Sequence, residues 1–137
     1  VWKDDKAVRN KADMLANLHS KDADVVDARG VGRFTGAEAE PRPEMASGHI
    51  PGSRNLPFGQ LFRADGTWKR GAELTQAFTD AGVDLNKPMI TTCGSGMTAA
   101  AVLFGARVTG KTDVALYDGS WSEWGLDPDT PKAQGAA

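Results

Sequence analysis

The chain has 137 residues, a net charge of −2, and 40% hydrophobic and 25% charged residues, a composition typical of a soluble globular protein. Its length predicts one domain over residues 1–137 with a core of its own. The near-neutral charge argues against nucleic acid as a partner, and no apolar run approaches the roughly 18 residues that span a membrane. Cys93 is the only cysteine, which excludes an internal disulfide and a multi-cysteine metal site.

These observations define what the protein is not expected to bind. We expect no metal, no cofactor, no nucleic acid and no membrane among its partners. A single cysteine suits a reducing compartment, so we expect a cytoplasmic location, with a mitochondrial one as the alternative. Because the first residue is Val1 rather than Met, we expect the chain to be trimmed or part of a longer one.

Apolar periodicity predicts strands and helices in alternation along the chain. Residues at helical spacing predict helices over 7–18, 71–81 and 99–108. Short apolar runs predict strands or extended segments over 23–28, 54–58, 89–92 and 113–117. The other stretches are predicted as a long loop over 29–48, an aromatic loop over 118–125 and a flexible tail over 128–137. The alternation predicts an α/β fold with a mainly parallel sheet covered by helices on both faces.

Cys93 lies where the predicted strand 89–92 passes into the loop Cys-Gly-Ser-Gly-Met-Thr and then into a helix. The free N–H groups and the dipole of a helix N-terminus favour a thiolate over a thiol. Gly94 and Gly96 allow a tight curl of the backbone with its amides pointing inward. An isolated free cysteine is usually a buried structural residue, but this position, on a turn beyond the carboxyl end of a strand, favours a nucleophile.

Five motifs, in order along almost the whole chain, resemble the rhodanese family of sulfurtransferases. They are Val25-Val26-Asp27-Ala28-Arg29, Gly32-Arg33-Phe34, Gly48-His49-Ile50-Pro51-Gly52-Ser53, the Cys93 loop, and Tyr117-Asp118-Gly119-Ser120-Trp121-Ser122-Glu123-Trp124. The resemblance implies a rhodanese-like three-layer domain. The loop is similar to that of the members that use 3-mercaptopyruvate, with Met97 in place of valine, whereas members that use thiosulfate carry basic residues directly after the cysteine.

The resemblance also implies a mechanism. Cys93 attacks the sulfur of 3-mercaptopyruvate and keeps it as a persulfide, pyruvate leaves, and a thiol such as reduced thioredoxin, or cyanide, accepts the sulfur. Ser95 passes or shares a proton with the substrate thiol. Arg33 and Arg42 hold the carboxylate and carbonyl of the substrate. The substrate and the persulfide are also bound by backbone amides of the loop, those of Gly94, Ser95, Gly96, Met97 and Thr98.

Several of these residues have a structural alternative. Ser95 also suits a helix N-cap, and Thr98 fits a cap or first-turn position better than a catalytic one. Arg33 and Arg42 are, in the alternative, solvated loop charges matched by nearby glutamates, namely Glu38, Glu40 and Glu44.

Other polar and aromatic residues near the motifs are interpreted as structural. We expect His49 to fix its loop by hydrogen bonding rather than to act as a general base. Asp27 and Arg29 are expected to form a pair at the end of a strand. Trp121 and Trp124 are expected to pack at the wall of the site or at a domain interface rather than to touch substrate.

The chain matches only the catalytic second half of the two-domain members of the family. We therefore expect a second rhodanese domain, on the same or another chain, to complete the site. A thiosulfate sulfurtransferase, and a non-catalytic sulfur-carrier or regulatory module, are the alternatives. A Cys-x5-Arg phosphatase is disfavoured because Ala99 stands where that chemistry needs an arginine.

Overall fold

A five-stranded sheet lies at the centre of the computed structural model, which describes residues 8–38, 40, 44–93, 97–117 and 119–135. The strand order is β1-β5-β4-β2-β3, and every neighbouring pair is parallel. The strands are β1 (Val8–Arg9), β2 (Asp24–Asp27), β3 (Arg54–Asn55), β4 (Met89–Thr92) and β5 (Val114–Tyr117). The predicted α/β class and parallel sheet are confirmed.

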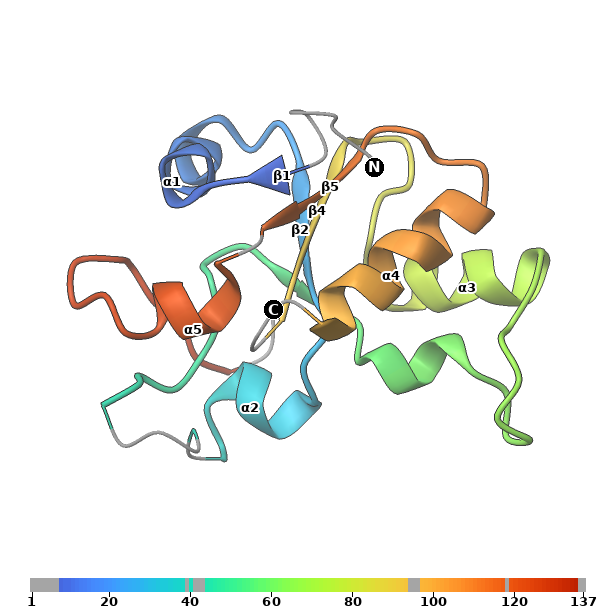
Figure 1. Ribbon diagram of the computed structural model, residues 1–137, viewed down its shortest axis with the longest axis horizontal. Coiled ribbons are helices and arrows are strands. Elements are labelled where there is room, and N and C mark those ends of the chain that lie inside the picture. The colour runs from blue at the N-terminus through green and yellow to red at the C-terminus, as the bar shows by residue number, and fades with distance from the viewer. Residues whose placement is uncertain (1–7, 39, 41–43, 94–96, 118, 136–137) are drawn as a thin grey trace.

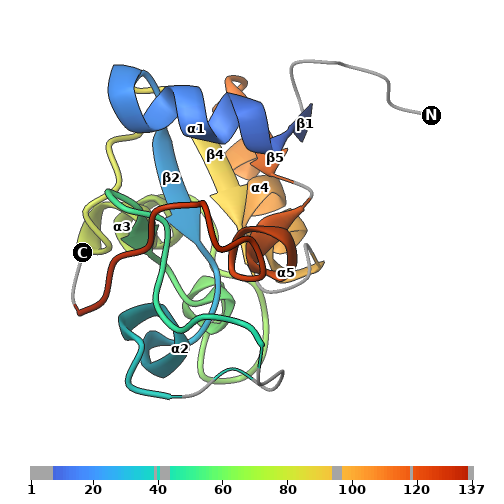
Figure 2. The ribbon, with the colours of Figure 1, turned by 90° about the vertical axis from the view of Figure 1, so that its left-hand side faces the viewer.

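Helices cover both faces of this sheet (Figure 1). On one face lie α1 (Lys11–Ser20) and α5 (Ser120–Trp124), and on the other lie α3 (Ala72–Asp80) and α4 (Met97–Val108). The short helix α2 (Val31–Thr35) lies beyond the end of β2 (Figure 2), and the 3-10 helix η2 (Phe58–Leu61) follows β3. Among the described residues, no helix is both long and apolar enough to span a membrane.

The strands feed two separate apolar cores, because successive side chains of a strand point to opposite faces. Val26 and Met89 are buried in the core beneath α3 and α4, whereas their neighbours Val25 and Ile90 are buried in the core beneath α1 and α5. Burying an aliphatic side chain of this kind contributes roughly 1.5–3 kcal/mol. Burial on both faces explains why these strands are continuous apolar runs in the sequence.

The first helix begins later than the predicted 7–18. Val8 and Arg9 pair in register with β5 as a short edge strand, and Asn10 ends the extended stretch as the helix N-cap. The Asn10 side chain accepts a hydrogen bond from the backbone of Asp13 (2.9 Å), and the Asp13 carboxylate accepts one from the backbone of Asn10 (3.0 Å). This capping box fixes the start of the helix.

Three more predictions are wrong in detail. The aromatic loop 118–125 contains α5, whose Trp121 and Trp124 are both buried in the core beneath α1 and α5. The long loop 29–48 contains α2, and the extended segment 54–58 pairs as a strand only over Arg54–Asn55 because η2 begins at Phe58.

Residues 130–135, which we call the C-terminal strap, pack against the body of the protein, although the sequence predicts a flexible tail there. Ala133 exchanges two backbone hydrogen bonds with His49 (2.8 and 2.9 Å), and Gly135 donates one to the carbonyl of Thr35 at the end of α2 (2.8 Å). Gly48 has a φ of +118°, and a Cβ there would lie 2.2 Å from the Ala133 carbonyl oxygen. A glycine at position 48 is therefore required for the strap to approach.

Candidate active site around Cys93

Cys93 follows the last residue of β4 at the carboxyl end of the sheet, where the sequence predicts it. Its backbone is fixed to the start of α5: the Cys93 N–H donates to the Ser120 hydroxyl (3.3 Å), and its carbonyl accepts from the Trp121 N–H (2.7 Å). The side chain is only 1% exposed and belongs to the apolar core beneath α4. Burial alone is also typical of a structural cysteine. The reactivity of the thiol therefore depends on the charged groups around it.

Several predicted loop residues, Gly94, Ser95 and Gly96, lie outside the described residues, as does Arg42. The amide cradle, the proton-transfer role of Ser95 and the substrate contact of Arg42 therefore stay predictions. Met97 and Thr98 form the first turn of α4, so the positive end of a 12-residue helix follows Cys93 closely.

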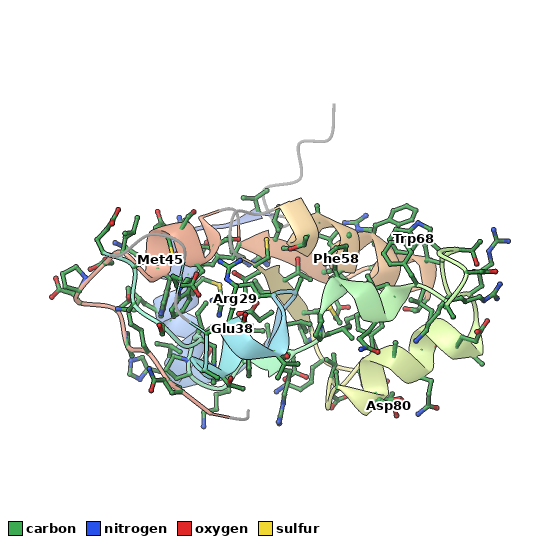
Figure 3. All side chains as sticks on the ribbon, turned by 90° about the horizontal axis from the view of Figure 1, so that it is seen from below. Arg29, Glu38, Met45, Phe58, Trp68 and Asp80 are labelled. Carbon is green, nitrogen blue, oxygen red and sulfur yellow. The ribbon has the colours of Figure 1, made fainter. Side chains whose placement is uncertain are left out.

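A buried cluster of alternating charges lies at the same end of the sheet, and Arg29 is at its centre. Figure 3, seen from this end, shows Arg29 in the interior of the molecule. Its guanidinium donates to the Asp27 carboxylate (2.8 Å), the Gly48 carbonyl (2.6 Å) and the Glu40 carboxylate (3.3 Å). The ring of Trp121 lies 4.5 Å from the guanidinium carbon. The predicted Asp27–Arg29 pair is confirmed, and Trp121 packs in the wall of the site.

Arg33 on α2 extends this cluster toward solvent. Its Nη2 donates to Glu40 Oε1 (2.7 Å) and its Nε to Glu40 Oε2 (3.4 Å), while the Arg33 side chain remains 34% exposed. The hydrogen bond with Glu40 raises the pKa of Arg33 above its ordinary value against the opposing effect of burial. The negative charges of Glu40 and Asp27 act in the same direction as this hydrogen bond.

The ion pair with Glu40 is a contact that the alternative interpretation of Arg33 predicts, in which the arginine is a loop charge matched by a nearby glutamate. It does not exclude a ligand, because a guanidinium has five N–H donors and Glu40 engages two of its nitrogens. From the sequence, Glu40 is expected only as one of three glutamates that would match solvated arginines, whereas its side chain is fully buried. The available signal was the position of this glutamate between two arginines, Arg33 and Arg42, in a loop that follows an Asp-Ala-Arg motif.

His49 is buried and has the structural role that the sequence predicts. Its Nδ1 is 2.7 Å from the Phe34 carbonyl, and its ring stacks on the Phe34 ring at a centroid distance of 3.9 Å. The imidazole thereby fixes α2, which carries Arg33. Over the described residues, no group of three His, Cys, Asp or Glu side chains is placed to hold a metal ion.

Comparison with known proteins identifies the family. Residues 10–127 match the sequence pattern of the family described as "Rhodanese-like domain". The chain belongs to this family. Its α/β fold, with a cysteine after the central strand β4, is the fold of a rhodanese-like domain.

Individual relatives of this rhodanese-like domain are longer proteins. It is 46% identical over 121 residues to the 3-mercaptopyruvate sulfurtransferase of Rattus norvegicus, covering 88% of this chain and 41% of that protein. It is also 46% identical over 125 residues to the thiosulfate sulfurtransferase of Cricetulus griseus, covering 89% and 42%.

A solved structure that resembles this chain is also about twice as long. The Tum1 protein of Saccharomyces cerevisiae superposes with a TM-score of 0.85 at 35% identity, covering 97% of this chain and 48% of that one. The rhodanese-like domain thus spans less than half of the length of the relatives named here.

Proposed function

We propose that this rhodanese-like domain is a sulfurtransferase in which Cys93 accepts a sulfur atom from 3-mercaptopyruvate as a persulfide and delivers it to a thiol, such as thioredoxin, or to cyanide. The observation that carries the proposal is the position of the single cysteine, between the carboxyl end of β4 and the N-terminus of α4, at the same end of the sheet as the cluster of Arg29, Glu40 and Arg33. Relatives named 3-mercaptopyruvate sulfurtransferase and thiosulfate sulfurtransferase support the same class.

The chemistry is a double displacement on sulfur. The Cys93 thiolate attacks the donor sulfur and forms an S–S bond. The C–S bond of the donor breaks, its electron pair stays on carbon, and the resulting pyruvate enolate takes up a proton to give pyruvate. An acceptor thiolate then attacks the outer sulfur, and Cys93 leaves again as a thiolate. Ser95 is the proposed group for moving the proton of the donor thiol in the first step.

The donor is selected by its charge in this proposal. Thiosulfate is a dianion and benefits from cations beside the sulfur, whereas 3-mercaptopyruvate carries one carboxylate at its far end. Residues 94–98 hold no cation, and Arg33 offers a planar fork of the kind that pairs with a carboxylate. Thiosulfate is the second candidate donor, favoured by the name of the Cricetulus griseus relative.

The proposal also includes a second domain, a non-catalytic alternative and a location in the cell. Because the relatives are more than twice as long as this chain, a second rhodanese domain is proposed to complete the site. A sulfur carrier without turnover of its own is the non-catalytic alternative. A cytoplasmic location, with a mitochondrial one as the alternative, stays the expectation from the sequence.

The test is mass spectrometry of the protein after mixing with each donor. A gain of one sulfur atom on the peptide that contains Cys93 is the expected result, with an equal amount of pyruvate released where 3-mercaptopyruvate is the donor and of sulfite where thiosulfate is. The Cys93→Ser variant is the matched control and should gain none. Catalytic release of pyruvate in the presence of an acceptor thiol separates an enzyme from a carrier. If neither 3-mercaptopyruvate nor thiosulfate loads Cys93, the proposal is wrong.

A further inference from the structure

Glu40 is a fully buried carboxylate in a loop whose neighbouring glutamate, Glu38, is exposed. Burying a carboxylate is unfavourable unless cations and hydrogen bonds replace its water. Glu40 obtains these from Arg29 at 3.3 Å and from Arg33 at 2.7 Å. Arg29 already has the Asp27 carboxylate and the Gly48 carbonyl as closer partners. The shorter of the two Glu40 contacts is the one to Arg33.

Glu40 contacts one edge of the Arg33 guanidinium, and the guanidinium has a second edge. Glu40 accepts from Nε and Nη2, the side edge of the guanidinium. The end edge, formed by Nη1 and Nη2, has N–H donors in the fork geometry that matches a second carboxylate. Among the described residues, the contacts to this guanidinium come from Glu40, and its side chain remains 34% exposed. Glu40 therefore does not contact Nη1, and part of the Arg33 side chain is open to solvent.

We propose that Glu40 is a positioning residue, whose buried carboxylate holds the side edge of Arg33 so that the end edge is presented to the carboxylate of the sulfur donor. The inference rests on the proposed function, because it takes Arg33 to be the ligand of the donor carboxylate. Glu40 itself touches neither the donor nor the reacting sulfur in this arrangement.

Glu40 is itself held in place by Arg29, which is buried in the protein. The Asp27 carboxylate at the end of β2 holds Arg29, and the Trp121 ring lies 4.5 Å from its guanidinium carbon. Arg29 in turn donates to Glu40, which orients Arg33. A long arginine side chain on a short surface helix is thereby ordered before the donor arrives, so that binding immobilises less of it.

A purely electrostatic role of Glu40 predicts the opposite effect. A negative charge beside Arg33 reduces the attraction of the guanidinium for an anion, so neutralising Glu40 would tighten donor binding. A positioning role predicts that the same change weakens donor binding, because Arg33 loses its fixed orientation. The sign of the change in donor affinity therefore distinguishes the two roles.

The experiment measures the rate of sulfur loading onto Cys93 of the full chain as a function of 3-mercaptopyruvate concentration. We expect Glu40→Gln to raise the half-saturating concentration about tenfold and to leave the limiting rate within about threefold, because the donor is misplaced rather than the nucleophile altered. Glu40→Asp, which keeps the charge, should recover part of the loss. Glu38→Gln is the matched control: it removes the same charge from the same loop and should behave as the unaltered chain.

The second readout is whether the effects of substitutions at Arg33 and Glu40 on the half-saturating concentration add in the double variant. Arg33→Ala should raise the half-saturating concentration, and adding Glu40→Gln to it should change that value less than about twofold, because the two residues act as a unit. Should Glu40→Gln fail to fold, Arg33→Lys carries the test, since lysine keeps the charge but has no second edge. We therefore expect the half-saturating donor concentration of Arg33→Lys to lie within about threefold of that of Arg33→Ala.

The failures of the two proposals differ. If Arg33→Ala weakens donor binding while Glu40→Gln leaves it unchanged or tightens it, the inference about Glu40 is wrong and the proposed function stands. A donor affinity of Arg33→Lys close to that of the unaltered chain likewise contradicts the inference. If Arg33→Ala has no effect on loading by 3-mercaptopyruvate, Arg33 is not the ligand, and the inference fails while sulfur transfer by Cys93 stands. If neither 3-mercaptopyruvate nor thiosulfate loads Cys93, both proposals fail together.

Discussion

At the residue scale, Arg29 supplies the positive charge that keeps two carboxylates, those of Asp27 and Glu40, inside the protein. All three side chains are buried, and Arg29 donates to both acids. Arg29→Met fills a similar volume but leaves two carboxylates without this cation. We expect it to lower the free energy of unfolding by about 3–5 kcal/mol, the usual effect of breaking a buried ion pair by removing one partner. Urea denaturation at pH 7 measures the difference.

The control for this prediction is another arginine with a carboxylate partner. Arg63 pairs with Glu73 at 2.5 Å, but both side chains are largely exposed. Water and salt screen such a pair, so Arg63→Met should leave the unfolding curve nearly unchanged. Equal effects of the two substitutions would contradict the assignment of Arg29 to a buried ion cluster.

Thr92, the residue before Cys93, gives a prediction of the opposite sign. Its Oγ1 is buried and has no hydrogen-bond partner among the described residues. Replacing an unsatisfied hydroxyl by a methyl group of similar size removes an unfavourable burial. Thr92→Val is therefore expected to leave stability unchanged or raise it by about 1 kcal/mol.

Thr130 is the matched control, because it is also a buried threonine. Its hydroxyl is within hydrogen-bonding distance of the carbonyls of Trp124 (2.6 Å) and Asp127 (3.0 Å). Thr130→Val leaves these carbonyls without that donor and should cost about 1 kcal/mol. The two valine variants are compared in one thermal melting experiment, and a clear loss of stability in Thr92→Val would show that its hydroxyl has a partner in solution.

At the element scale, the C-terminal strap joins α5 to α2. Trp124 donates through its indole N–H to the Pro131 carbonyl (2.7 Å), and Ala133 pairs with His49. Deleting residues 130–137 removes these bonds and uncovers Trp124. We expect a loss of about 3–6 kcal/mol, from roughly 1 kcal/mol for each of these three hydrogen bonds and up to about 3 kcal/mol for an uncovered large apolar side chain. Denaturant unfolding measures it.

A single substitution tests the pairing without removing the strap. Ala133→Pro eliminates the N–H that donates to the His49 carbonyl (2.9 Å). The amide hydrogen of His49, which donates to the Ala133 carbonyl, should then exchange faster with solvent. Unaltered exchange of the His49 amide in this variant would mean that the strap is not paired in solution.

The elements that the sequence identifies are those with long or continuous apolar patterns. Strand β4 occupies the predicted residues, and α3 matches within two residues at either end. Helices α2 and α5 have five residues each, which is shorter than the window over which helical periodicity can be recognised. The three-residue spacing of Trp121 and Trp124, which places both on one helix face, was the available signal for α5.

At the scale of the whole molecule, the candidate site combines segments that are far apart in the sequence. Arg29 and Glu40 lie in two loops and contact each other, while Ser120 at the start of α5 contacts Cys93. These residues gather because parallel strands bring their carboxyl ends to one edge. The motifs predicted which residues gather there. They did not predict that Glu40 is buried between Arg29 and Arg33, because burial depends on how the loop after α2 packs, and no periodicity describes that.

A last prediction concerns the contact that joins the two ends of the chain. Lys11, at the start of α1, donates to the Asp127 carboxylate beyond α5 (2.5 Å). This hydrogen bond lowers the pKa of Asp127 and raises the pKa of Lys11 relative to their ordinary values. A carboxylate with a lowered folded pKa stabilises the fold above its unfolded pKa, near 3.9, and this stabilisation is lost as the pH falls through the folded value. The Lys11 contribution is present below the unfolded pKa of about 10.4 and is lost as the pH rises through the higher folded value.

The contact should therefore stabilise the protein between about pH 4 and pH 10, and Asp127→Asn should melt at a lower temperature across that range. The melting temperatures of the variant and the unaltered chain should converge as the pH falls from about 4 through the lowered folded pKa of Asp127, where the carboxylate takes up its proton. Added salt should reduce the difference at pH 7, because both side chains are partly exposed. Asp80→Asn is the control, since Asp80 accepts its hydrogen bond from the uncharged Gln76 side chain. A difference for Asp127→Asn that persists unchanged at pH 2.5 would contradict the ion pair.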